Sequence, residues 1–223
     1  MNACVIDGGL STALEEAGHS LDDRLWTARL LIDDPEAIVT AHLAFLRAGA
    51  RVLISSSYQA SEAGFVAAGL EPDAAVEALR STTALAVEAR ARFALEDPTG
   101  ARDVLVAASV GPYGATLGDG SEYRAPTLDD LSLVDFHTER LRVLIDTERD
   151  VLAIETISST RETHAIVSAL NALTPTAITE GQVTAAATAS SIGSPPQVAA
   201  VSRHVNVTQA RSGGKTLSAP TIA

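Results

Sequence analysis

The stretch DPEAIVTAHLAFLRAGARVLISSSYQAS, residues 34–61, decides the fold class because it joins two different hydrophobic patterns. Its first part has an acidic first turn, Pro35 near the start and Gly49 at the end, which is the arrangement typical of a helix over 34–49. Its second part, 51–57, is short, nearly continuously apolar and rich in β-branched residues, as expected of a strand buried on both faces. The stretch therefore predicts a helix followed by a strand.

The same alternation runs through most of the chain. Further strands are expected at 3–9, 103–112 and 150–157, and further helices at about 73–93, 128–145 and 159–173. This alternation predicts a parallel sheet with helices between its strands. In the helix over 128–145, apolar residues at helical spacing mark one face, namely Leu128, Leu131, Val134, Leu141 and Leu144. His137 lies on that face, so we expect a buried histidine there rather than a ligand.

The strand starts are about 50 residues apart, which fits a (β/α)8 TIM barrel with long loops after its strands. Four such units are visible, and all lie within residues 1–175. Residues 176–223 are rich in Ala, Thr and Ser and have only weak periodicity. We therefore predict a single barrel domain over 1–223 in which 176–223 is a remnant. Because a barrel needs eight strands, either this tail adds little regular structure or the barrel is incomplete.

Composition excludes several classes of partner. The formal net charge is −12, and all but one of the 16 basic residues are Arg, scattered without a run that could follow phosphates, so nucleic acid is not expected as a partner. No segment has the roughly 20 apolar residues of a membrane span. A single cysteine, Cys4, cannot form an internal disulfide, and no export signal is evident. We predict a cytoplasmic protein, in which the sequon at Asn206 arises by chance.

The candidate site residues follow the expected strands, because barrel sites form at the carboxyl ends of the strands. Asp7 is either a helix-capping residue or a site carboxylate. Gly8 and Gly9 serve a turn or let a ligand approach the backbone. Glu155 ends a buried strand, where a carboxylate needs a cation or hydrogen-bond donors, so a ligand contact is favoured. The remaining candidates form a polar loop whose hydroxyl and amide groups could bind a ligand: Ser57, Tyr58 and Gln59.

Four segments in this order resemble the homocysteine S-methyltransferase family, in its S-methylmethionine-using branch. They are IDGGLSTALEEAGHSL, LWTARLLIDDPEAIVTAHLAFLRAGARVLISSSYQAS, ASVGPYGATLGDGSEYRA and FHTERLRVLIDTERDVLAIETI, and the similarity covers about residues 5–175. The resemblance implies a zinc-dependent barrel that transfers a methyl group from a sulfonium donor, S-methylmethionine or S-adenosylmethionine, to the thiol of homocysteine, giving methionine. It further implies that Asp7 and Glu155 hold the homocysteine ammonium group and that Tyr58 and Gln59 line the pocket.

The C-terminal third departs from that family. In the family, zinc holds the substrate as its thiolate, the reactive nucleophile, and three cysteines bind the zinc. Here Val207 stands at the first cysteine position, and SGGKT, residues 212–216, has two glycines without a following cysteine. Truncation, a change of reading frame or omitted segments would each account for this. For the chain as written we predict negligible zinc affinity, no residue that we can assign as catalytic, and little or no methyl transfer.

Other functions find less support in the sequence. A Schiff-base aldolase needs a lysine inside the barrel, whereas the only lysine is Lys215 in the tail. The GGKT motif does not have phosphate-loop spacing, because Gln209 stands where a glycine is required. The alternative from another class is a catalytically inactive relative that only binds the amino acid. An open barrel exposes strand edges, so a homodimer or aggregation is expected if the barrel is incomplete.

Overall fold

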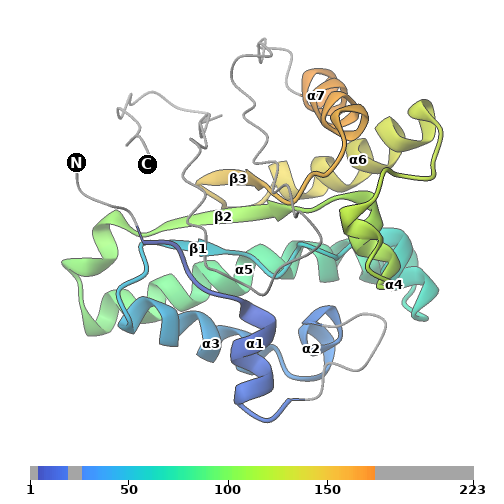
Figure 1. Ribbon diagram of the computed structural model, residues 1–223. Coiled ribbons are helices and arrows are strands. Elements are labelled where there is room, and N and C mark those ends of the chain that lie inside the picture. The colour runs from blue at the N-terminus through green and yellow to red at the C-terminus, as the bar shows by residue number, and fades with distance from the viewer. Residues whose placement is uncertain (1–4, 20–26, 174–223) are drawn as a thin grey trace, which may run out of the picture.

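A computed structural model describes residues 5–19 and 27–173, which form an α/β structure around a three-stranded parallel sheet (Figure 1). Strands β1 (Val52–Ile54), β2 (Leu105–Val110) and β3 (Val151–Ile154) lie in the order β1-β2-β3. In the ladders Leu53 pairs with Val106 and Ser109 pairs with Ala153. All strand pairs are parallel, so the predicted parallel sheet with intervening helices is confirmed.

The four helices predicted from periodicity correspond to the four longest helices of the structure. Helix α3 shows why the sequence signals work: Asp34 accepts a hydrogen bond from the Ala37 amide at 3.2 Å, and Pro35 is the first helical residue. Gly49, just beyond its end, has φ +107°, which favours glycine. The helices are α1 (Leu10–Glu16), α2 (Thr27–Asp33), α3 (Pro35–Arg47), α4 (Glu62–Ala67), α5 (Pro72–Glu96), α6 (Asp130–Ile145) and α7 (Thr160–Leu173). Three short 3₁₀ helices are η1 (Gly100–Asp103), η2 (Tyr113–Leu117) and η3 (Ser121–Tyr123).

The core lies mainly on the helix-covered face of the sheet. Leu53 and Val106 pack against α3 and α5, where Leu46 and Phe93 belong to the same cluster. A second cluster joins α5, α6 and α7 to the end of β2. The opposite face of the sheet contributes a third cluster that contains only strand residues or their neighbours: Val52, Ile54, Leu105, Ala107, Val151 and Ala153. This alternation follows from the two-residue repeat of side-chain direction along a strand.

The expected first strand over 3–9 is reduced in the structure to one isolated bridge. Ile6 bridges to Val52 in parallel, and the Asp7 amide donates to the Val52 carbonyl at 3.0 Å. Val5 and Ile6 are 54% and 53% exposed. The prediction of a strand buried on both faces is therefore wrong for the described part, residues 5–9, because this segment lies at the sheet edge. Cys4 lies outside the described residues.

The buried face of α6 differs from the one inferred from leucine spacing. Leu131 is 79% exposed, whereas Leu133 and His137 are fully buried. Leu131 precedes Leu133 by two residues, about 200° around the helix, so the two side chains point to opposite sides. Leu133, His137, Arg140 and Leu144 form the buried stripe. The expectation of a buried His137 is confirmed.

The closed eight-stranded barrel is not seen among the described residues, which hold three strands and one bridge. The predicted remnant at 176–223, with Asn206, Val207, Gln209 and Lys215, lies outside them. Across 5–19 and 27–173, every helix is too short or too polar to cross a bilayer.

Candidate functional site

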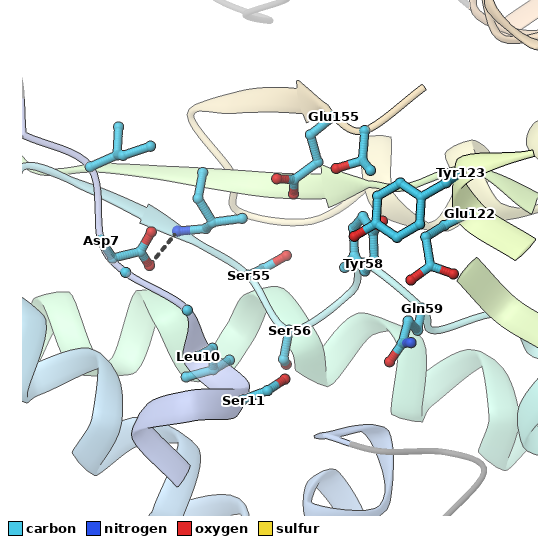
Figure 2. A pocket seen from close by; sticks show the side chains of 15 residues that line it. Asp7, Leu10, Ser11, Ser55, Ser56, Tyr58, Gln59, Glu122, Tyr123 and Glu155 are labelled. Atoms are coloured by element: carbon cyan, nitrogen blue, oxygen red, sulfur yellow. Dashed lines mark hydrogen bonds between the residues drawn. The ribbon is translucent and has the colours of Figure 1, made fainter. Parts of the chain in front are cut away.

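A pocket of about 510 Å³ opens at the carboxyl ends of the strands. It lies where the chain leaves β1 and β3 and where residues 6–11 enter α1, and the loop after β2 closes one side through η3 (Figure 2). This placement agrees with the general rule for parallel α/β folds that binding sites form outside the carboxyl ends of the strands. The lining residues are Ile6, Asp7, Gly8, Gly9, Leu10, Ser11, Ile54, Ser55, Ser56, Tyr58, Gln59, Glu122, Tyr123, Glu155 and Thr156.

Asp7 is a pocket carboxylate and does not cap helix α1, whose N-cap is Gly9. Its Oδ2 accepts a hydrogen bond from the Ile54 amide at 2.8 Å, as the dashed line in Figure 2 marks. Its Oδ1 is buried without a hydrogen-bond partner among the described residues, and so is the hydroxyl of the neighbouring Ser56. Burial raises the pKa of Asp7 to about 7, and the negative charge of Glu155 adds to this effect. Buried unpaired oxygens in a pocket are the groups that a ligand donor would satisfy.

His42 of α3 lies behind Asp7 and is fully buried. Its Nδ1 is 3.9 Å from Asp7 Oδ2, a separation that would suit an ion pair only if the imidazole were protonated. Burial lowers the pKa of His42 to about 4, so the ring is neutral at pH 7. At 3.9 Å the contact is also too long for a hydrogen bond. His42 is therefore a neutral, buried neighbour of Asp7 that helps to exclude water from the Asp7 carboxyl.

Glu155 directly follows β3, at the edge of the sheet opposite β1. Serines at the strand ends fix the position of its side chain. The Ser109 hydroxyl donates to Glu155 Oε1, and the Ser109 amide donates to the Ser55 hydroxyl at 3.1 Å. Ser57 is fully buried, shares a hydrogen bond of 2.7 Å with Ser55, and donates to the Ser109 carbonyl at 2.7 Å. Burial raises the pKa of Glu155, against the Ser109 hydrogen bond and the charge of Arg140, which lower it.

Tyr58 and Thr156 form the wall between the two carboxylates and η3. Burial raises the pKa of Tyr58 to about 12, against the neighbouring Thr156 side chain, which lowers it, so the Tyr58 hydroxyl stays protonated. Thr156 has φ +58°, a left-handed conformation that is unfavourable for a β-branched residue and costs about 1–3 kcal/mol. Strained backbone of this kind often occurs at functional sites, and here it lies directly after Glu155.

Six of the seven residues predicted from the sequence line this pocket, and their roles toward a ligand remain predictions. Ser57 is the exception: contrary to the prediction, it does not line the pocket, because its hydroxyl donates to the Ser109 carbonyl on the neighbouring strand. Gly8 has a packing reason, since a Cβ there would lie 2.9 Å from the Phe45 ring.

Sequence reasoning missed the pocket residues Glu122 and Tyr123 and the buried residues Ser109, Arg140 and Glu162. Glu122 and Tyr123 lie in a loop that no periodicity describes, so the sequence offered no local signal for them. The sequence did contain a local signal for the burial of Arg140, because this residue follows His137 by three positions and so shares its helix face.

The pH dependence of stability tests the environment of Asp7. Its pKa is about 7 in the folded chain against 3.8 in the unfolded chain. Between these values the folded state holds a proton that the unfolded state has lost, so stability falls as pH rises from about 4 to 7. We expect Asp7→Asn to gain about 2–4 kcal/mol relative to the wild type between pH 4.5 and 7.5.

Urea unfolding of both proteins at the two pH values measures this gain. Burial of neutral His42 acts with the opposite sign, because its folded pKa of about 4 makes stability fall as pH drops below about 6.5. The difference between the two proteins cancels that contribution, since His42 is common to both. A difference that does not change with pH would contradict the burial of Asp7 described above.

The described residues do not form a metal site of the implied kind. Across 5–19 and 27–173, no three His, Cys, Asp or Glu side chains come together as a ligand group. The chain has one cysteine, so it cannot provide three thiolates. Asp7 and Glu155 are instead two pocket carboxyls whose pKa values are raised by burial.

Known proteins resemble this chain both in sequence and in structure. Residues 4–210 match the profile of a protein family described as homocysteine S-methyltransferase. Homocysteine S-methyltransferase 1 from Brassica oleracea var. italica is 44% identical over 173 residues, which are 74% of this chain and 53% of that protein. Homocysteine S-methyltransferase from Escherichia coli is 41% identical over 169 residues, 75% of this chain and 54% of that protein.

A solved structure matches as well. The metallated form of the homocysteine methyltransferase MmuM from Escherichia coli superposes with a TM-score of 0.72 at 40% identity, over 77% of this chain and 60% of that chain. The chain thus spans about half the length of the curated relatives that it matches.

Proposed function

Because the chain belongs to the homocysteine S-methyltransferase family, we propose that its pocket binds homocysteine by the amino-acid end of that molecule. The chain then provides the homocysteine-binding part of an enzyme that transfers a methyl group to the homocysteine thiol, giving methionine. The donor in this proposal is a sulfonium compound, S-methylmethionine or S-adenosylmethionine.

The observation that supports this proposal most directly is the pairing of Asp7 and Glu155 in one pocket. Burial raises the pKa of both carboxyls, and the negative charge of Glu155 further raises the cost of ionising Asp7. An ammonium group placed between them would offset both effects and would satisfy the unpaired Asp7 Oδ1. Binding of the cation should therefore release protons near pH 7.

We also propose that β1, β2, β3 and the segment around Ile6 correspond to four strands of a (β/α)8 barrel in a single domain. Their parallel order and the TM-score of 0.72 support this proposal. Among the described strands, β3 pairs only with β2, and an unpaired strand edge is where a second chain can add. Self-association through that edge would give the homodimer suggested by the sequence, and light scattering of the purified chain tests it.

Methyl transfer also requires activation of the homocysteine thiol, and the residues of this chain do not provide the three-cysteine zinc site expected for that task. A bound zinc ion would hold the thiol as its reactive thiolate, yet three cysteine ligands do not fit a chain with one cysteine. What the described residues offer instead is orientation: Asp7 and Glu155 at the ammonium end, with Tyr58 and Gln59 along the pocket wall.

Isothermal titration calorimetry of the full chain tests the proposal. L-Homocysteine should bind in a 1:1 complex, and 4-mercaptobutyrate, which lacks the ammonium group, should bind at least roughly 30-fold more weakly because a buried carboxylate is left unpaired. Titration in two buffers of different ionisation enthalpy should reveal the released protons. Equal affinity for the two thiols would contradict the assigned role of the carboxylates, and absence of homocysteine binding would reject the proposal.

The lack of three cysteines favours a second candidate, a relative that binds the amino acid without turning it over. Methionine formation separates the two candidates. The assay combines homocysteine with each sulfonium donor, with and without added zinc, and mass spectrometry detects the product. Binding that does not depend on metal and is not accompanied by methionine supports the second candidate, whereas turnover supports the enzyme.

A further inference from the structure

Arg140 is a buried cation that belongs to helix α6 but bonds the loops of the pocket. The residue is 1% exposed. Its Nη1 donates to the Gly111 carbonyl at 3.0 Å, and its Nη2 donates to the Tyr58 carbonyl at 2.7 Å and to the Ser57 carbonyl. One side chain thus satisfies carbonyls in the loops after both β1 and β2.

A buried guanidinium is costly, so its contacts call for an explanation. Burial lowers the pKa of Arg140 to about 10, and the charges of Glu162, Tyr58 and Glu155 act in the opposite direction. Arg140 is the donor for the Gly111 and Tyr58 carbonyls, which would otherwise lose a hydrogen bond at a free-energy cost for each, whereas the Ser57 carbonyl also accepts from the Ala60 amide at 3.1 Å. Arginine suits this task because its planar fork carries several donors in fixed directions, whereas lysine is a point charge.

Tyr58 is fixed from a second side by Gly111. A Cβ on Gly111 would lie 2.5 Å from the Tyr58 carbonyl oxygen and 2.6 Å from Cδ2 of its ring. The ring therefore packs directly on bare backbone, and from there it reaches the pocket wall and the Thr156 side chain. Figure 2 shows Tyr58 on the side of the pocket where Glu122 and Tyr123 also lie.

We propose that Arg140 is a positioning residue: its guanidinium, together with the bare backbone of Gly111, fixes the Ser57–Tyr58 backbone so that the Tyr58 side chain forms one wall of the pocket. The proposal rests on the proposed function in one respect, that the pocket takes homocysteine. Arg140 itself does not line the pocket, so its effect on a ligand must pass through Tyr58.

Arg140→Lys is the test variant, because it keeps the charge and loses the fork. We expect it to weaken homocysteine binding by roughly 10-fold in calorimetry. The matched control is Arg90→Lys, since Arg90 is partly buried and, like Arg140, bonds a backbone carbonyl: it contacts Asp150 and the Val104 carbonyl at the opposite end of the strands. The control should lose stability as well, yet keep its affinity within about 2-fold, since distant sites act independently.

A double-mutant cycle separates positioning from a general loss of structure. In a Tyr58→Ala background, Arg140→Lys should change the affinity by less than about 2-fold, because the group through which it acts has been removed. The same loss in both backgrounds would overturn the proposal. Should Arg140→Lys fail to fold, Gly111→Ala displaces Tyr58 from the other side, and it must give the same pattern.

A measurement without ligand keeps the inference separate from the proposed function. The chain has three tyrosines, so carbon-13 labelling of tyrosine rings gives few NMR signals, and Tyr58→Phe assigns the relevant one. Arg140→Lys should shift the Tyr58 signal, and Arg90→Lys should not. If the wild type binds no homocysteine, the proposed function fails while this result still decides the role of Arg140. An unchanged Tyr58 signal in Arg140→Lys would overturn that role.

Discussion

Glu155→Gln is expected to weaken homocysteine binding by roughly 30-fold or more, because loss of one partner from a buried, hydrogen-bonded charge pair costs about 2–5 kcal/mol. Gln keeps the size of the side chain and still accepts a hydrogen bond from the Ser109 hydroxyl, so the pocket should keep its shape. The change removes only the negative charge that would face the ammonium group. Calorimetry of the folded variant at pH 7.5 measures the effect.

The control for net charge is Glu36→Gln, which removes a carboxylate of α3 from its exposed pair with Arg92 of α5. It should leave the affinity within about 2-fold, because exposed pairs far from the pocket contribute little. Asp7→Asn should have a smaller effect than Glu155→Gln below pH 7, since the Asp7 carboxyl is then largely protonated in the free chain. Wild-type affinity in Glu155→Gln would remove the main support for the proposed binding mode.

Glu162→Leu is expected to lower the free energy of unfolding by about 3–5 kcal/mol, the usual cost of leaving a buried charge without its partner. Glu162 is fully buried in α7, and its Oε1 accepts from the Tyr113 amide at 2.5 Å and contacts His137 Nε2 at 3.0 Å. Its negative charge is also the strongest electrostatic effect that offsets the burial of Arg140. Leu would remove all of these contributions at once.

Urea unfolding followed by circular dichroism measures that loss, with Glu162→Gln as the matched variant. Gln keeps an oxygen for the Tyr113 amide and loses the charge, so it should be less destabilised than Leu. Glu36→Gln should stay within about 0.5 kcal/mol of the wild type, as expected for an exposed position. Equal stability of wild type and Glu162→Leu would mean that Glu162 and Arg140 do not depend on each other.

The sequence was sufficient for the elements whose signals are local. Helix α3 has its capping residue, its proline and its terminal glycine in sequence, and the structure places all three as expected. The expected strand at 3–9 was misjudged, because an apolar run does not reveal that Val5 and Ile6 lie at a sheet edge. On α6, periodicity found the right helix but assigned Leu131 to the wrong face, since Leu131 and Leu133 lie on opposite sides of the helix and spacing alone does not show which side is buried.

The site was predictable to the extent that strand ends determine it. Asp7 and Glu155 could be named because both follow apolar runs, and parallel strands bring their carboxyl ends to one edge. Ser57 was misplaced because in a polar run the direction of each side chain depends on how the chain leaves the strand. Arg140 and Glu162 act through contacts between segments that are distant in sequence. Arg140 and Tyr58, for example, are 82 residues apart along the chain. No local pattern encodes such contacts.

The left-handed backbone of Thr156 has a consequence for laboratory evolution. Glycine or asparagine would adopt φ +58° more readily than threonine. A library selected only for heat resistance should therefore enrich these two residues at this position. Lineages that must also retain the ligand should keep threonine, whose side chain meets Tyr58.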